Sequence, residues 1–139
     1  MRSLFFAAAL LATAGCSSGN SAKWPELHTV RGIVKIGGQT ATGGYIVFRG
    51  EGSTNADFTV GGNVGSDGTF MLGTLHSLEK GSSQKSGAPA GNYRVLYMPA
   101  GGGDQITGSS VEPIPSIKPV TVAPGPNDLA IVLSAPKKK

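Results

Sequence analysis

The sequence predicts an all-β fold, a β-sandwich of about seven antiparallel strands. Two observations carry this prediction: apolar side chains recur at every second position in several short stretches, and glycine-rich turns separate those stretches. In the part of the chain after Cys16, no stretch of twelve residues combines a helical period with capping residues. The 22 glycines among 139 residues are also too many for a helical bundle.

Each expected strand has a set of apolar residues on one face. In the first strand, Val30, Val34 and Ile36 share a face, and the turn Gly37-Gly38 ends the run. The strands are expected at residues 29–36, 45–49, 58–60, 69–72, 93–98, 119–122 and 129–133. The later inward positions are Ile46, Phe48, Phe70, Leu72, Tyr93, Val95 and Tyr97.

Turns and loops separate these strands. Ser66-Asp67-Gly68 indicates a tight turn before residues 69–72, and Pro119 suits an edge strand because proline has no N–H to donate. The polar residues 77–89 have no apolar period, so we expect a mobile loop there. Residues 99–116 are expected to form a second loop.

The N-terminus has the pattern of a secretory signal. Arg2 precedes the apolar stretch Leu4–Ala12, which is much shorter than the roughly 20 residues needed to span a bilayer. Cys16 follows the small residues Ala14 and Gly15. Because it is the only cysteine, it cannot form a disulfide within the chain. One interpretation is an ordinary secretory signal that leaves Cys16 as a free thiol near the mature N-terminus.

Residues 10–16 resemble a bacterial lipobox, with Thr13 where that pattern usually has leucine. The resemblance implies that Cys16 takes a lipid, becomes the new N-terminus and anchors the protein outside the cytoplasm. The chain then divides into a signal peptide (1–15), a flexible tether (16–27), a sandwich domain (28–134) and a basic tail (135–139). The tether is small and polar apart from Trp24.

The basic charge does not indicate nucleic-acid binding. Without residues 1–15 the formal charge is +3, since Arg2 is the only charge removed, and Lys137 to Lys139 account for all of it. The body of the domain is therefore neutral and lacks the basic face that nucleic acid requires. We expect the tail to be solvated.

Few residues suggest catalysis or metal binding, and we expect no cofactor. His28 and His76 are far apart and lack the spacing of a zinc site, so each is expected at a strand end or on the surface. Ser82-Ser83 and Ser109-Ser110 lack a nucleophile elbow, and Asp67 belongs to the expected turn. The remaining acids show no pairing that singles out two of them.

The order of the β-strand motifs resembles that of a carboxypeptidase regulatory-like or transthyretin-like domain, as in small planctomycete lipoproteins. The motifs are Val30-Arg31-Gly32-Ile33-Val34, Gly43-Gly44-Tyr45-Ile46-Val47-Phe48, Gly65-Ser66-Asp67-Gly68-Thr69-Phe70-Met71-Leu72, Gly87-Ala88-Pro89-Ala90-Gly91-Asn92-Tyr93-Arg94-Val95 and Val120-Thr121-Val122-Ala123-Pro124-Gly125-Pro126-Asn127-Asp128-Leu129. They cover most of residues 28–133. The resemblance implies a Greek-key sandwich at the cell surface and no particular reaction.

Two enzyme families on related sandwiches have motifs that this chain lacks. Hydroxyisourate hydrolases end in Tyr-Arg-Gly-Ser, whereas this chain ends with Ser134-Ala135-Pro136 and three lysines. Intradiol dioxygenases bind iron through two tyrosines and a His-x-His pair, which is missing here. Tyr45, Tyr93 and Tyr97 are therefore expected as core or half-buried strand residues.

The sequence thus favours a non-enzymatic, lipid-anchored module of the cell envelope, at the periplasmic or cell-surface face of a bacterial membrane. It would have a structural or binding role, with an envelope protein or a polysaccharide as partner. The alternative is a carbohydrate-binding surface module. Such modules stack aromatic rings on sugars, and Trp24, Tyr45 and Tyr97 are the candidate rings.

Overall fold

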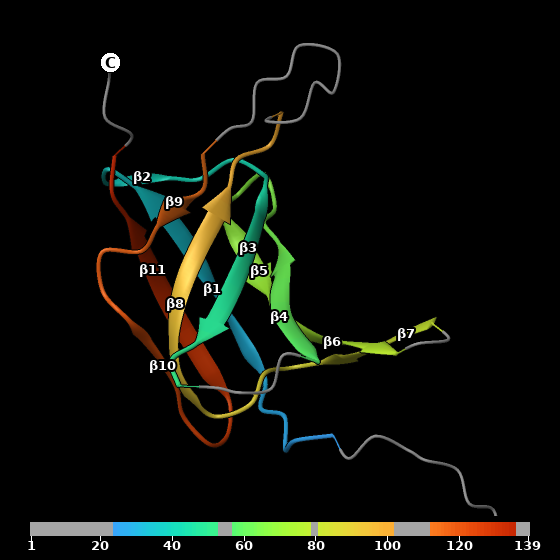
Figure 1. Cartoon of the computed structure of the whole chain (residues 1–139). Helices are drawn as coiled ribbons and strands as arrows, with labels where there is room; N and C mark the ends of the chain where they lie inside the picture. Colours follow the sequence, from blue (N-terminus) through green and yellow to red (C-terminus); the bar gives the residue numbers. More distant parts are fainter. Residues whose placement is uncertain (1–23, 53–56, 79–80, 102–111, 136–139) are drawn as a thin grey trace, which may run out of the picture.

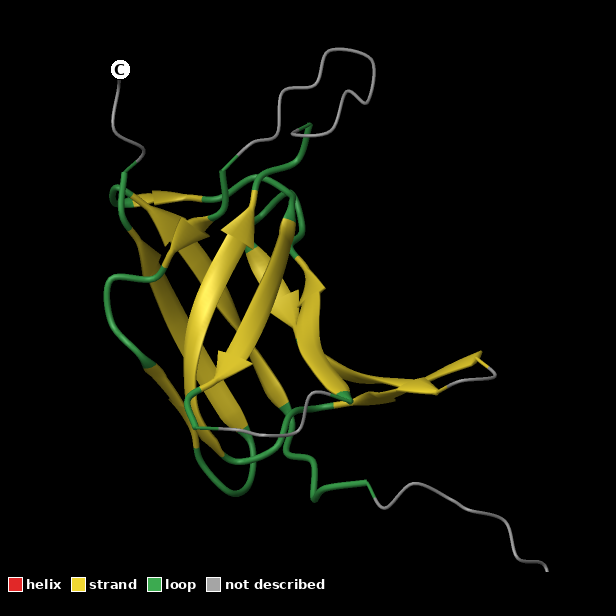
Figure 2. Ribbon diagram, in the orientation of Figure 1, coloured by secondary structure: helices red, strands yellow, loops and turns green. Residues whose placement is uncertain are grey.

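The computed structural model describes residues 24–52, 57–78, 81–101 and 112–135. This part of the chain forms eleven strands and no helix, and the strands lie in two facing sheets (Figures 1 and 2). The predicted all-β sandwich is confirmed. Cys16 and the rest of residues 1–23 lie outside the described residues, as do residues 136–139.

The smaller sheet is built around β1 (Val30–Ile36). β11 (Asn127–Leu133) runs parallel to β1 along its whole length. On the other side of β1 lie two short antiparallel strands, β2 (Gln39–Thr40) and β5 (Thr69–Met71). The expectation of antiparallel strands throughout was therefore wrong for β1 and β11. These two strands are the first and last of the domain, so no hairpin forces them to be antiparallel.

The larger sheet is antiparallel, with the strand order β10-β8-β3-β4-β6-β7. β9 pairs with the end of β8 beyond β10. β10 lies at the edge, as Pro119 indicated. The bounds are β3 (Tyr45–Gly50), β4 (Phe58–Asn63), β6 (Gly73–Leu78), β7 (Gly81–Ser86), β8 (Gly91–Met98), β9 (Ile114–Pro115) and β10 (Val120–Val122).

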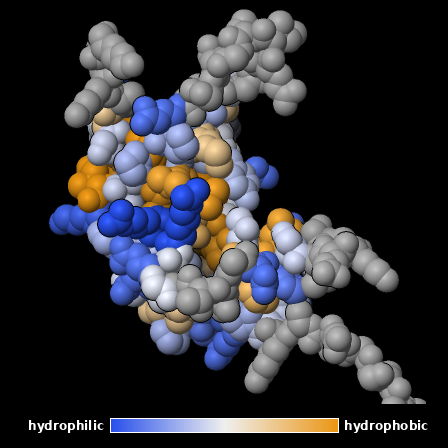
Figure 3. Space-filling model, in the orientation of Figure 1, coloured by the Kyte–Doolittle hydropathy of each residue, from blue (hydrophilic) through white to orange (hydrophobic). Residues whose placement is uncertain are grey.

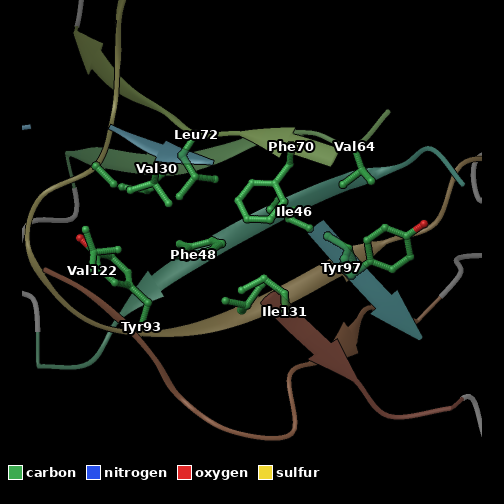
Figure 4. Packing of buried hydrophobic residues seen from close by; sticks show 14 of the residues in the cluster. Val30, Ile46, Phe48, Val64, Phe70, Leu72, Tyr93, Tyr97, Val122 and Ile131 are labelled. Atoms are coloured by element: carbon green, nitrogen blue, oxygen red, sulfur yellow. The ribbon is translucent and has the colours of Figure 1, made fainter. Parts of the chain in front are cut away.

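The core lies between the two sheets, where side chains from both inner faces meet (Figure 4). The predicted alternation is confirmed in β1, β3, β5 and β8, and Ile36 alone among the predicted inward residues is only partly buried. Burial of apolar area of this kind supplies most of the favourable free energy of folding. The fully or nearly fully buried members include Val30, Val34, Ile46, Phe48, Phe70, Leu72, Tyr93, Val95, Tyr97, Val122, Ile131 and Leu133.

The turn before β5 forms as predicted. The carboxylate of Asp67 accepts hydrogen bonds from the backbone N–H of Thr69 at 3.1 Å and from its hydroxyl at 2.7 Å. Gly68 has a φ of 78°, a conformation that glycine adopts without strain. The turn therefore depends on a side-chain cap and on a residue without a Cβ.

Two expected loops contain strands, so those predictions were wrong in part. Within residues 77–89, β7 pairs with β6 to form a hairpin that projects beyond the sandwich (Figure 1). Within residues 99–116, β9 pairs with β8. The serine-rich β7 has no apolar alternation, but a ladder of backbone hydrogen bonds requires none. Residues 79–80 and 102–111 lie outside the described part.

Candidate functional site

The two histidines occupy different environments. The Nδ1 atom of His28 accepts a hydrogen bond from the Gly125 N–H at 3.0 Å, and its backbone pairs with Ala88, so His28 has a structural role. His76 is only 6% exposed, and it lies within β6 rather than at a strand end. The expectation of a strand-end or surface position was wrong for His76. Alternation along β6 turns Thr74 and His76 towards the inner face.

His76 belongs to a group of four side chains, called here the aromatic cluster: Trp24, Phe58, His76 and Lys85. The imidazole of His76 stacks on Phe58, with 4.4 Å between ring centroids and 20° between ring planes. Trp24 lies tilted against Phe58 at 5.3 Å and edge-on to His76 at 5.8 Å. The Lys85 ammonium is 4.7 Å from the centre of the Trp24 ring, within the range of a cation–π interaction.

The cluster fastens the N-terminal segment to the base of the projecting hairpin. Phe58 comes from β4 and Lys85 from β7, and Trp24 comes from the segment that the sequence assigned to the flexible tether. The sequence did not predict the packing of Trp24, because one tryptophan in a polar stretch forms no periodic pattern. The Nδ1 atom of His76 is buried and has no hydrogen-bond partner among the described residues.

A groove of about 910 Å³ adjoins the cluster and shares Phe58 with it. Tyr93 also lines the groove, and its hydroxyl donates a hydrogen bond to the Pro89 carbonyl at 2.7 Å. Arg49 and Glu51 also line it, near the end of β3. The groove is thus lined by both apolar and charged side chains.

The three rings considered for sugar stacking do not share a surface. Tyr97 is 2% exposed and its hydroxyl donates to the Gly43 carbonyl at 2.6 Å, so the expectation that it could stack on a sugar was wrong. Tyr93 and Tyr97 are core residues, as expected, and burial raises the pKa of both phenols. Tyr45 of β3 lies on the outer face of the larger sheet. Its register partner Asn63 is at the opposite end of β4 from Phe58.

The other candidate residues have structural positions or lie outside the described part. Asp67 caps its turn, and the two hydrogen bonds from Thr69 lower the pKa of the Asp67 carboxyl. Ser82 and Ser83 belong to β7, whereas Cys16 and Ser109-Ser110 are not described. Within the described ranges, no three His, Cys, Asp or Glu side chains gather as a metal site. Those ranges also contain no helix long and apolar enough to cross a bilayer.

Comparisons of the chain with protein-family models, with curated proteins and with solved structures found no match.

Proposed function

We propose that this protein is a lipid-anchored, extracytoplasmic module of the bacterial cell envelope. It acts without catalysis, as a structural or binding module of carboxypeptidase regulatory-like or transthyretin-like type. Support comes from the sequence: Arg2 and the apolar stretch Leu4–Ala12 precede Ala14-Gly15-Cys16, the arrangement that lipidation of a secreted chain requires. The all-β sandwich agrees with the fold that the strand motifs resemble.

The docking of Trp24 determines how a lipid on Cys16 would place the domain. Trp24 lies eight positions after Cys16 in the sequence, a length that spans at most about 28 Å when fully extended. Trp24 packs on Phe58 and His76, so the chain is fixed to the sandwich at that point. A lipid on Cys16 would hold the domain within a short distance of the membrane. It would also direct the projecting hairpin, to which Trp24 is fastened, towards the membrane side.

The anchor is tested by fractionation of cells that express the full chain or its Cys16→Ser variant. We expect the wild-type chain in the membrane fraction and the C16S chain in the soluble extracytoplasmic fraction. Ser17→Ala is the matched control and should remain with the membrane. Mass spectrometry should show a wild-type chain that begins at Cys16 and carries acyl groups. An unmodified thiol, or a C16S chain that stays in the membrane, would refute the anchor.

Carbohydrate binding is retained as a second function because of Tyr45. Its side chain is 37% exposed on the outer face of the larger sheet, unlike those of Tyr93 and Tyr97. One exposed ring alone does not define a binding site, so the ligand class depends on the side chains around Tyr45.

A further inference from the structure

The hydroxyl end of the Tyr45 ring lies against the backbone of the neighbouring strand. A Cβ atom at Gly61 would lie 2.7 Å from the Tyr45 hydroxyl oxygen and 3.0 Å from Cζ, so the ring occupies the space above this glycine. Gly61 itself is buried. The hydroxyl end of the ring therefore packs on the sheet while Tyr45 remains 37% exposed. A ring held in this way offers a fixed surface for stacking at little cost in side-chain entropy.

A second glycine lies beside Gly61 on the next strand of the sheet. Gly73 on β6 is the register partner of Gly61, and a Cβ at Gly73 would lie 2.8 Å from Nε2 of Gln84. The exposed carboxamide of Gln84 therefore covers the second glycine, as the Tyr45 ring covers the first. An amide beside an aromatic ring supplies a hydrogen-bond donor and an acceptor for hydroxyl groups.

Two arginines face each other across β3 and β8. Arg49 on β3 and Arg94 on β8 are direct register partners, an arrangement in which like charges destabilise the sheet. Arg94 donates to the Glu51 carboxylate at 3.3 Å, but its side chain is 79% exposed. Arg49 is exposed and has no ion-pair partner within the described ranges. The pair therefore carries a surplus positive charge that an anionic group would neutralise.

Tyr45 and Arg49 lie on one face of the sheet, four residues apart along β3 and hence about 13 Å apart. Val47 and Leu96, which are register partners, lie between them on this face. Figure 3 views this side of the molecule and shows hydrophilic side chains crossing an otherwise apolar region. The surface is therefore a band along β3 and β8 with the Tyr45 ring at one end, an apolar middle and two guanidinium groups at the other. The Gln84 amide lies to the side of this band, over Gly73.

We propose that this band, on the outer face of β3 and β8, binds an acidic polysaccharide. The inference rests on the proposed role as an envelope binding module and names the ligand class. The apolar face of one sugar packs on Tyr45, and a carboxylate further along the chain accepts hydrogen bonds from Arg49 and Arg94. The Cα atoms of Tyr45 and Arg49 are about 13 Å apart, more than the length of one sugar ring, so a chain of sugars rather than a single sugar would contact both ends. Beyond the two arginines the neutral domain body lacks the density of cations that nucleic acid demands.

Calorimetric titration of the full chain in detergent tests this inference. Polygalacturonate is the acidic probe and dextran is the neutral one. We expect polygalacturonate alone to bind, and its affinity to fall as salt is added. Arg49→Gln and Arg94→Gln should each weaken binding about tenfold, the loss expected for one charge-assisted hydrogen bond. Arg31→Gln is the matched control because Arg31 lies on the other sheet, and it should leave the affinity unchanged.

Tyr45 is tested by two variants. Tyr45→Phe should retain binding because the ring remains, and Tyr45→Ala should weaken it at least tenfold while the circular dichroism spectrum keeps its β-sheet form. Equal affinity for dextran, or an unchanged affinity in R49Q and R94Q, would overturn the inference. So would tighter binding of single-stranded DNA or of phosphatidylglycerol vesicles that depends on the same arginines.

These outcomes are separable from a failure of the anchor. A C16S chain that leaves the membrane but does not bind polygalacturonate refutes the ligand and keeps the anchor. A C16S chain that binds polygalacturonate but stays in the membrane refutes the anchor and keeps the ligand.

Discussion

The imidazole of His76 stacks on the ring of Phe58, with 4.4 Å between the ring centroids. Trp24 closes this stack from the side, so segments that are distant in the sequence meet at the base of the projecting hairpin. Aromatic pairs of this geometry add roughly 0.5–1.5 kcal/mol beyond the area they bury. The contact therefore holds the N-terminal segment and the hairpin together.

Removing Phe58 should release Trp24. In Phe58→Ala the stacked surface is lost, so Trp24 should become solvated. Trp24 is the only tryptophan, so the tryptophan fluorescence reports the surroundings of this residue alone. We expect a shift of the emission maximum to longer wavelength and stronger quenching by acrylamide.

Met71→Ala is the control for this measurement. Met71 is 60% exposed on the smaller sheet, so its loss should leave the emission of Trp24 unchanged. Identical spectra for F58A and the wild-type protein would show that Trp24 is not docked in solution.

The unpartnered nitrogen of His76 predicts a stabilising substitution. A buried polar atom without a hydrogen bond costs about 1–3 kcal/mol. His76→Phe removes Nδ1 and keeps a ring against Phe58, so the free energy of unfolding should rise by about 1 kcal/mol. His76→Ala should lower it by about 2 kcal/mol because a cavity remains. Urea unfolding at pH 7 measures both, and an H76F protein less stable than wild type would contradict the prediction.

The core could be predicted from the sequence because each strand faces the core with every second residue. Val30, Ile46 and Phe70 follow this rule, and all three are buried. The aromatic cluster could not be predicted in this way. Its members come from separate segments. His76 is a polar residue at an inward position of β6, so the apolar alternation that marks a strand is missing there.

The parallel neighbours β1 and β11 were missed for a similar reason. Alternation shows which face of a strand is buried, but it carries no information on strand direction or on which strands are neighbours. Turns specify these only where two strands are joined by a short hairpin. The band from Tyr45 to Arg49 and Arg94 was also missed, because Arg94 becomes a neighbour of Arg49 only through the pairing of β3 with β8.

The Asp67 turn predicts a pH-dependent stability. The hydrogen bonds from Thr69 lower the pKa of Asp67 below its ordinary 3.8, so the folded state favours the ionised carboxylate. The resulting stabilisation is present above pH 3.8 and is lost as the pH falls through the lowered folded-state pKa. Asp67→Asn should therefore reduce the thermal midpoint at pH 7.

The difference between D67N and wild type should shrink as the pH falls below about 3.8, the ordinary carboxyl pKa. Thr69→Val provides a second test because it removes the hydroxyl donor from the same carboxylate. A difference between D67N and wild type that stays constant from pH 7 to pH 2 would contradict this account.

Asn127 should be critical for the turn between β10 and β11. Its amide nitrogen donates to the carbonyls of Ala123 and Gly125, each at 2.8 Å, and its oxygen accepts from the Ala123 N–H at 2.9 Å. Asn127→Ala leaves these partly buried backbone groups unsatisfied and should lower the free energy of unfolding by about 2 kcal/mol. The matched control, Asn63→Ala, changes an exposed asparagine and should have an effect below about 0.5 kcal/mol. Equal effects in urea unfolding would refute the role of Asn127.

Tyr97 predicts a loss of stability at alkaline pH. Burial raises the pKa of its phenol above 10.0, so the folded state favours the protonated hydroxyl, which donates to the Gly43 carbonyl at 2.6 Å. This contribution is fully present below pH 10.0 and is lost as the pH rises through the raised folded-state pKa. Tyr97→Phe should lower stability by about 1 kcal/mol at pH 7, through the lost hydrogen bond. The variant should also lose less stability than wild type above pH 10.0, as measured by urea unfolding.

Tyr93 has a pKa raised by the same cause, so only the double variant Tyr93→Phe/Tyr97→Phe should remove both contributions. A double variant as sensitive to alkali as wild type would show that other groups cause the alkaline unfolding.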